Sequence, residues 1–219
     1  MAEFLTGSVR AYLDALASGE STPGGGSAAG LGGATAAALL CMSARFTIGR
    51  EKYAAFEPQA QAVLDQAEPL RADLQALMEA NAAAYARYRA AVALPKDTDD
   101  AQAVRARALQ AATKVSGEVP LTIARKCIRL LELGKILAAN CNPFLVSDVV
   151  VATHFALGAF NSAVINVRMN LGSVKDADLA LAWGRELLDM VTMAPTLARE
   201  ALELAYEAMN LPLEGDFPA

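Results

Sequence analysis

The spacing of apolar residues predicts a chain of helices joined by short polar breaks. Apolar positions recur every three to four residues through most of the sequence, and no stretch sustains the strict alternation of a strand with turn signals at its ends. This pattern predicts an all-α fold, a bundle of about six helices in a single domain over residues 1–219. The expected helices cover residues 3–19, 27–48, 54–93, 98–139, 147–170 and 176–209.

Caps and prolines indicate where these helices begin, end or bend. Ser27 and the pair Ser147-Asp148 are suitable N-cap residues for the second and fifth helices. The stretch 97–100 supplies caps and negative charge for the start of the fourth helix. Proline removes a backbone donor, so four prolines are candidate breaks or kinks: Pro58, Pro69, Pro120 and Pro195.

Two of the expected helices carry almost no charge on any face, over 27–44 and 149–167. A helix that is apolar all round lies centrally, with others packed around it. One chain of this size can enclose one such helix, and enclosing two involves a partner more naturally, so we expect a homo-oligomer, most simply a dimer. Residues 24–44 are also long enough to span a membrane, but their small side chains favour a buried core helix.

Composition and charge narrow the class of protein. Hydrophobic residues make up 54% and charged residues 20% of the chain, which argues against disorder. The formal net charge of −5 argues against general nucleic-acid binding, and the N-terminal MAEFLTGSVR is not a secretory signal. Cys41, Cys127 and Cys141 are widely spaced and indicate neither a disulfide framework nor a zinc site. We therefore expect a cytoplasmic protein with no membrane or nucleic-acid partner.

A glycine-rich turn, TPGGGS at 22–27, precedes the second helix. Its glycines permit backbone dihedrals closed to other residues, and the helix N-terminus that follows favours an anion such as a carboxylate. A tight turn beside a closely packed helix explains the same sequence equally well. The candidate ligand contacts in this turn are Pro23, Gly24, Gly25, Gly26 and Ser27.

Two groups of polar residues recur at helical spacing. Asn81, Tyr85 and Tyr88 share one face of the third helix, and Asn166 and Asn170 lie one turn apart on the otherwise apolar fifth helix. Polar side chains inside a bundle need partners, so each group is a candidate site. A solvated face or a subunit interface is the alternative explanation.

Other candidates lie near helix ends. Lys96 follows Pro95 in a loop and is either fixed over a pocket or exposed. Asn142, Ser147 and Asp148 surround the start of the fifth helix, where helix capping is the default explanation.

A basic cluster, Arg45, Arg50 and Lys52, either holds an anionic small molecule or forms a solvated helix end. The single histidine, His154, is expected in the core. With one histidine and no cysteine cluster, a His-based metal site and a Ser–His–Asp triad are excluded. Any proton transfer must then use a carboxylate, Lys, Tyr, a substrate group or water.

Five ordered stretches resemble the cyclodeaminase/cyclohydrolase family of folate enzymes. They are TPGGGSAAGLGGATAAAL at 22–39, FTIGREKY at 46–53, ALPKDTDD at 93–100, VPLTIA at 119–124, and NPFLVSDVVVA through NVRMN at 142–170. The family includes formiminotetrahydrofolate cyclodeaminase, also found as the C-terminal half of formiminotransferase-cyclodeaminase, and a methenyltetrahydrofolate cyclohydrolase. The resemblance implies an all-helical oligomer with a folate site in a cleft between helices.

The resemblance also implies the substrate: a tetrahydrofolate derivative, often with a polyglutamate tail, and neither a metal nor a redox cofactor. Such a tail gives the glycine turn and the cluster Arg45, Arg50 and Lys52 an anionic partner, and the adjoining Tyr53 is a further candidate for substrate binding. Both family reactions act on the N5/N10 bridge. The cyclodeaminase expels ammonia from 5-formiminotetrahydrofolate to give 5,10-methenyltetrahydrofolate, and the cyclohydrolase adds water to the methenyl carbon to give 10-formyltetrahydrofolate. Both need a group that moves a proton.

The sequence departs from the family pattern at the residue expected to transfer the proton. The family's acidic residue before its LPK loop, which the resemblance implies acts in proton transfer, corresponds to Asn81. An amide can hold a ligand but cannot act as a general base. The catalytic candidates are therefore Asn81, Asp148 and Lys96. The alternatives are altered chemistry, a non-catalytic folate-binding protein, and a purely structural helical oligomer.

Overall fold

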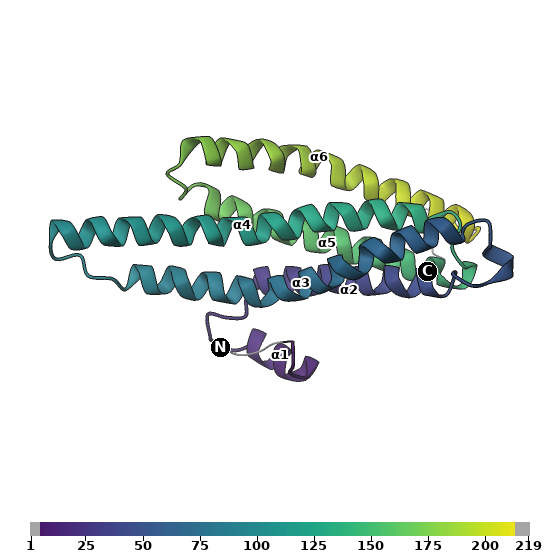
Figure 1. Cartoon of the computed structure of the whole chain (residues 1–219), viewed down its shortest axis with the longest axis horizontal. Coiled ribbons are helices and arrows are strands. Elements are labelled where there is room, and N and C mark those ends of the chain that lie inside the picture. Colours follow the sequence, from purple (N-terminus) through teal and green to yellow (C-terminus); the bar gives the residue numbers. More distant parts are fainter. Residues whose placement is uncertain (1–4, 213–219) are drawn as a thin grey trace.

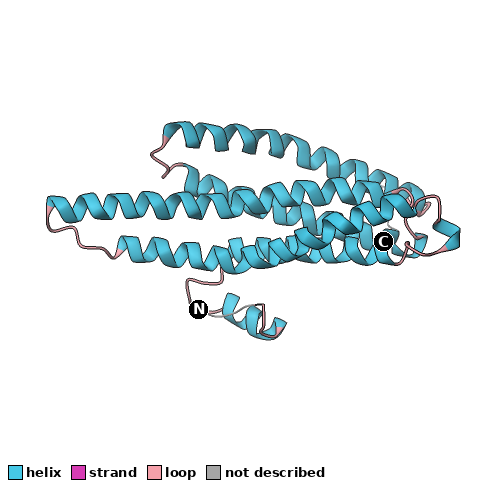
Figure 2. Cartoon of the chain, in the orientation of Figure 1, coloured by secondary structure: helices cyan, strands magenta, loops and turns pink. Residues whose placement is uncertain are grey.

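The computed structural model describes residues 5–212, and these residues form α-helices and short 3₁₀ turns without a strand (Figures 1 and 2). The predicted all-α bundle is confirmed. The helices are α1 (Val9–Leu16), α2 (Gly25–Arg45), α3 (Glu57–Val92), α4 (Asp99–Ala138), α5 (Val146–Leu171) and α6 (Ala177–Ala208), with 3₁₀ turns at Glu51–Tyr53 and Pro143–Leu145.

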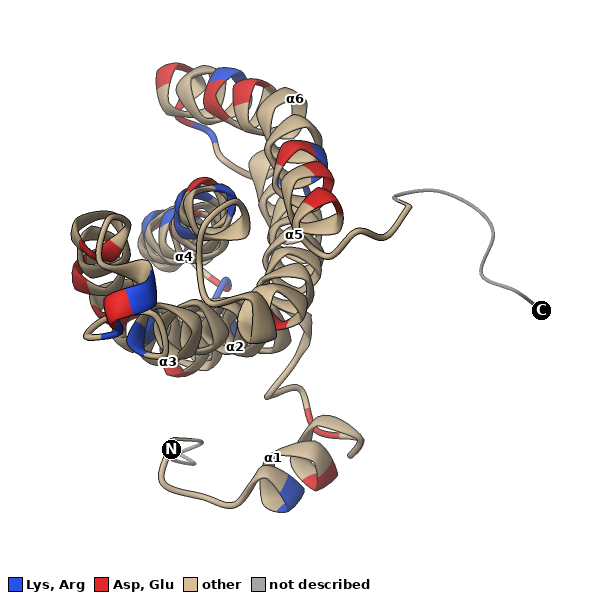
Figure 3. Cartoon of the chain, turned by 90° about the vertical axis from the view of Figure 1, so that its right-hand side faces the viewer, with Lys and Arg blue, Asp and Glu red and all other residues tan. Residues whose placement is uncertain are grey.

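Helices α2 to α6 lie side by side along one long axis, and α1 lies apart from them (Figures 1 and 3). The chain connections at 46–56 and 139–145 meet at one end of the bundle, which we call the joint end. Those at 93–98 and 172–176 lie toward the other end. The lengths and directions of α3, α4 and α5 therefore decide which polar residues meet.

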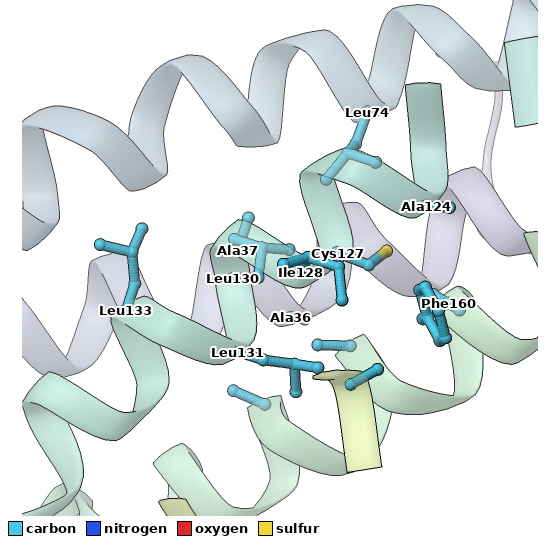
Figure 4. Packing of buried hydrophobic residues seen from close by; sticks show 14 of the residues in the cluster. Ala36, Ala37, Leu74, Ala124, Cys127, Ile128, Leu130, Leu131, Leu133 and Phe160 are labelled. Atoms are coloured by element: carbon cyan, nitrogen blue, oxygen red, sulfur yellow. The ribbon is translucent and has the colours of Figure 1, made fainter. Parts of the chain in front are cut away.

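The two uncharged helices lie in the core, as predicted. Ala36 and Ala37 of α2 and Phe160 of α5 are almost fully buried among leucines of α4 (Figure 4). Close approach depends on glycine, because a methyl group at Gly33 would lie 3.0 Å from Leu74 Cδ2. Charged residues gather on α3, α4 and α6 instead (Figure 3).

Both helices are long and apolar enough to cross a membrane, but the most apolar window of α2 is 61% buried inside the bundle. The corresponding window in α5 is only 44% buried. Apolar side chains therefore remain exposed on the outer face of α5, including Val151, Phe155, Ile165 and Met169.

Two predicted caps are wrong. Helix α2 begins at Gly25 with Gly24 at its N-cap, and the Ser27 hydroxyl instead accepts a hydrogen bond from the Tyr12 hydroxyl at 3.2 Å. Helix α5 begins at Val146, before Ser147, because the 3₁₀ turn at Pro143–Leu145 leads straight into it. Cap propensity favoured serine at both places, and tertiary and neighbouring backbone contacts set the boundary instead.

The prolines divide into two kinds. Pro58 lies in the first turn of α3, where its missing N–H is tolerated. Pro69, Pro120 and Pro195 lie inside continuous helices, so none of these three ends a helix. Residues 3 and 4 of the expected first helix, and the polar tail after residue 212, lie outside the described residues.

Candidate active site

A cavity of about 290 Å³ opens between the middle of the α3–α4 hairpin and the C-terminal part of α5. We call it the cleft. It contains five of the residues singled out from the sequence and several that were not. The lining consists of Asn81, Ala84, Tyr85, Tyr88, Thr113, Ser116, Asn166, Met169, Asn170 and Ser173.

On the α3 side, the amide of Asn81 has no hydrogen-bond partner among the described residues. The side chain is partly exposed and lines the cleft, so its oxygen and nitrogen remain available to a ligand. Tyr85 and Tyr88 follow on the same face and are each 38% exposed. The predicted grouping of these three residues is therefore correct.

The glycine turn explains how α2 reaches this place. A methyl group at Gly26 would lie 2.3 Å from Asn81 Nδ2, so any larger residue there would displace the Asn81 amide. A methyl group at Gly25 would lie 4.0 Å from Asn166 Nδ2. Packing therefore accounts for Gly26, and the same packing brings the N-terminal amides of α2 beside the cleft.

On the α5 side, Asn166 and Asn170 use their amide nitrogens on their own helix. Asn166 Nδ2 donates to Ser162 O and Asn170 Nδ2 donates to Asn166 O, each at 2.8 Å. These bonds fix the two side chains and leave both side-chain oxygens without a partner among the described residues. Two hydrogen-bond acceptors are thus held at the wall of the cleft.

The α4 side was missed by the sequence analysis. Ser116 Oγ is buried, lines the cleft and has no hydrogen-bond partner among the described residues. A buried hydroxyl without a partner is unfavourable, which makes it a candidate contact for a bound ligand or water. Thr113, one turn earlier, is 3% exposed. A single serine on an amphipathic helix carries no sequence signal that separates it from surface serines.

The electrostatics of the cleft are unusual for an enzyme site, because its lining contains no Asp, Glu, His, Lys or Arg. Its polar groups are amides, hydroxyls and phenols. The strongly shifted groups of the described chain lie elsewhere: burial raises the pKa of Cys127 to about 12 and that of Cys141 to about 11. No group of three or more His, Cys, Asp or Glu residues in the described chain could hold a metal ion.

The structure places other predicted site residues at the joint end. Tyr53 donates its hydroxyl proton to Asn142 Oδ1 at 3.2 Å, and Asn142 Nδ2 donates to Phe46 O at 3.2 Å. Asn142 thereby ties the α2–α3 connection to the α4–α5 connection. Lys52 lies over the Tyr53 ring, with Nζ 5.6 Å from the ring centroid. Arg50 is the extended residue just before the same 3₁₀ turn.

Asp148 lies at the joint end as well, and Ser147 beside it is exposed in the first turn of α5. Asp148 and Asn166 are eighteen residues apart on one straight helix, which separates them by about 27 Å. Within one chain, Asp148 therefore does not reach the cleft. Arg45 is also engaged at this end, in an ion pair with Glu68.

Lys96 and His154 lie in two further cavities. Lys96 lines one of about 610 Å³ near the tip of the α3–α4 hairpin. His154 lines an open groove of about 410 Å³ between α2 and α5 and is exposed, so its expected place in the core is wrong. The reason is that no element within residues 5–212 covers the outer face of α5.

Comparison with known proteins places this geometry in a family. The family model described as formiminotransferase-cyclodeaminase matches residues 8–188. A methenyltetrahydrofolate cyclohydrolase from Methylorubrum extorquens is 35% identical over 92% of this chain and 97% of its own. The formimidoyltransferase-cyclodeaminase of Gallus gallus is 30% identical over 76% of this chain, which covers 31% of that longer protein.

The fold agrees with a solved structure. Formiminotetrahydrofolate cyclodeaminase from Thermotoga maritima superposes with a TM-score of 0.83 at 25% identity, covering 92% of this chain and 97% of that one. The chain belongs to the formiminotransferase-cyclodeaminase family, as the resemblance of its motifs indicated.

Proposed function

We propose that this protein is a folate one-carbon enzyme whose reaction is the hydrolysis of 5,10-methenyltetrahydrofolate to 10-formyltetrahydrofolate in the cleft. The observation that carries the proposal is the uncharged lining, with Asn81 where the family pattern has an acidic residue. The 35% identity to a methenyltetrahydrofolate cyclohydrolase supports it.

The chemistry of the substrate explains why such a lining suits hydrolysis. The bridge carbon of methenyltetrahydrofolate lies between two nitrogens that share a positive charge, so it is already electrophilic and needs no acid to activate it. Unpartnered amide oxygens favour a cation, and they accept hydrogen bonds from an attacking water. Asn81, Asn166 and Asn170 provide such oxygens around one cavity.

The steps then balance without a protein acid or base. Water adds to the methenyl carbon and loses one proton to solvent, which gives a tetrahedral carbon bearing a hydroxyl group. The C–N5 bond breaks as the hydroxyl becomes the formyl carbonyl, and its proton neutralises N5. The net reaction consumes one water and releases one proton. The contribution of the cleft is to hold N5, N10 and water in the reacting geometry.

Cyclodeamination is the second candidate, favoured by the solved relative from Thermotoga maritima. It consumes protons, because the leaving nitrogen must depart as ammonia, and the described lining offers only the weakly acidic phenols of Tyr85 and Tyr88 for that step. Purified protein assayed with both substrates separates the two reactions. We expect faster loss of the methenyl compound than in buffer and no ammonia from the formimino compound. Ammonia release without methenyl hydrolysis would replace our proposal with the second candidate.

We also propose that the protein is a homodimer that uses the outer face of α5. This face exposes Val151, Phe155 and Ile165 at helical spacing and carries no charge between Asp148 and Arg168. The groove beside it is lined by small residues of α2, which would allow close approach of a second copy. Sedimentation of Phe155→Glu should show monomer where the native protein sediments as a dimer.

The matched control for that experiment is Val104→Glu, which adds the same charge at a 49%-exposed valine of α4. If both variants keep the native sedimentation, this face is not the interface. The three free, buried cysteines support a cytoplasmic location, where thiols stay reduced.

A further inference from the structure

A second cavity adjoins the cleft and differs from it in charge. It has a volume of about 610 Å³, and we call it the basic groove. Its lining contains three ionisable residues, Lys96, Arg105 and Lys175, and no carboxylate. None of the three forms an ion pair with a described residue. In a chain with a formal net charge of −5, three unpaired cations in one cavity form a local site for an anion.

The groove and the cleft lie end to end along α4 and the connection at 172–176. Gln110 of α4 lines the groove, and Thr113 and Ser116, on the next two turns, line the cleft. Both cavities also reach the connection at 172–176, where Ser173 belongs to the cleft and Lys175 to the groove.

Gln110 fixes the connection where the two cavities meet. Its Nε2 donates to Ser173 O at 3.1 Å, and its Oε1 accepts from Lys175 N at 2.9 Å. The hydrogen bond between the Lys175 backbone and Gln110 therefore fixes the position of Lys175 beside the groove. Among the acids nearby, Asp176 pairs with Lys114 at 2.8 Å, whereas Asp97, Asp99 and Asp100, which follow Lys96 in the chain, are exposed to solvent and outside the lining of the groove.

The two cavities together have the shape and charge of a bipartite ligand. From Ser116 to Arg105 is eleven residues of α4, or about 16 Å along the helix. A tetrahydrofolate has a polar ring system at one end, an aromatic spacer, and a glutamate tail whose carboxylates lie at the far end. An uncharged cleft followed by a cationic groove matches that order.

We propose that the basic groove binds the carboxylates of the folate glutamate tail, and that Lys96, Arg105 and Lys175 set the preference for tail length. This inference rests on the proposed function, since it needs the ring system in the cleft. It assigns Lys96 to substrate binding rather than to proton transfer. It also places the tail at the opposite end of the bundle from Arg50 and Lys52, the cations that the sequence offered for it.

The test compares the dissociation constants of tetrahydrofolate monoglutamate and triglutamate. We expect the native protein to bind the triglutamate about tenfold more tightly at low salt, a preference that falls as ionic strength rises. Lys96→Gln/Lys175→Gln should reduce that preference to about twofold, because two of the three cations that face the tail are removed. Both side chains are exposed, so the double variant should keep its fold. Arg105→Gln should act in the same direction.

The matched control is Arg10→Gln/Arg185→Gln, which removes two exposed cations that line neither the cleft nor the basic groove and should keep the native preference. The rival location is tested with Arg50→Gln/Lys52→Gln. Loss of the preference there, or an unchanged preference in Lys96→Gln/Lys175→Gln, overturns the inference. Binding with tail preference but without turnover of either substrate would defeat the proposed function alone, and no binding of either ligand would defeat both.

Discussion

At the C-terminal end of α5, Asn166 and Asn170 present to a cavity amide oxygens that have no partner among the described residues. At the joint end, every polar atom of the Asn142 side chain is engaged. Asn142 Oδ1 accepts from Tyr53 and Phe144, and its Nδ2 donates to a backbone carbonyl. The residue type is the same at both ends. The difference teaches that an asparagine beside a cavity indicates a binding site when its amide still has a hydrogen-bonding atom without a partner. It indicates a structural joint when every hydrogen-bonding atom of the amide has one.

Among the changes that test this comparison, we expect Gly26→Ala to have the largest effect on activity. Gly26→Ala places a methyl group within 2.3 Å of Asn81 Nδ2, so Asn81 or the start of α2 must move. We expect kcat/KM for the folate substrate to fall by about a hundredfold, since small displacements of positioning groups carry costs of that order. Gly19→Ala, where nothing lies within 4 Å, is the control for the assay. Equal activity of the two variants would mean that Asn81 does not contact substrate.

The next largest effect is expected from a pair of alanine variants, one in the cleft and one at the joint end. Asn81→Ala should lower kcat/KM by about tenfold to a hundredfold, because an amide that contacts the ligand is lost, and should leave the melting temperature nearly unchanged. Asn142→Ala should do the reverse, keeping kcat/KM and costing about 1–3 kcal/mol of stability, or about 3–10 °C in melting temperature. Thermal unfolding and steady-state kinetics on both variants check this. A catalytic defect in Asn142→Ala with normal stability would erase the distinction.

A smaller effect is expected at Ser116. Removing a buried hydroxyl without a partner relieves a desolvation cost, so Ser116→Ala should leave stability equal or raise it by up to about 1 kcal/mol. If the hydroxyl contacts substrate, KM should rise by roughly fivefold, the effect of one neutral hydrogen bond. Unchanged KM together with raised stability would show that Ser116 is only a packing defect.

The smallest effect is expected at an ion pair that belongs to neither end. The pKa of Glu186 is lowered mainly by its hydrogen bonds from Arg125, which joins α4 to α6. A carboxyl with a lowered pKa contributes stability above its unfolded pKa and loses it as pH falls through the folded pKa. Glu186→Gln should therefore cost under about 1 kcal/mol at neutral pH and less in acid, since the pair is partly exposed. Its kcat/KM should equal the native value, and a change would show that the α4–α6 contact shapes the cleft.

Much of this fold could be predicted because helix periodicity and charge are local properties. The uncharged stretches 27–44 and 149–167 indicated the core helices, and four-residue spacing paired Asn166 with Asn170 correctly. The caps at Ser27 and Ser147 could not be predicted, because Tyr12 and the 3₁₀ turn before α5 decide them.

The candidate site was only half predictable for the same reason. The face containing Asn81 and Tyr85 follows from spacing within one helix. The inclusion of Ser116 depends on how far α3, α4 and α5 are shifted along one another, and that register is set by tertiary packing. Asp148 is excluded because about 27 Å of α5 separates it from Asn166, once the structure has placed the cleft at Asn166. The sequence offered the cluster Arg45, Arg50 and Lys52 for an anion, and nothing in the sequence indicated that Arg105 and Lys175 line one cavity with Lys96.

The central claim is that the cleft hydrolyses its substrate without a protein carboxylate, and the pH dependence of kcat/KM tests it most directly. After correction for the reaction in buffer, the native protein should show no acid limb from an enzyme carboxyl between about pH 4 and 8, and Asn81→Asp should gain one. An acid limb in the native protein that Asn81→Asp leaves unchanged would contradict the account, because it would place an essential carboxylate at the reacting atoms.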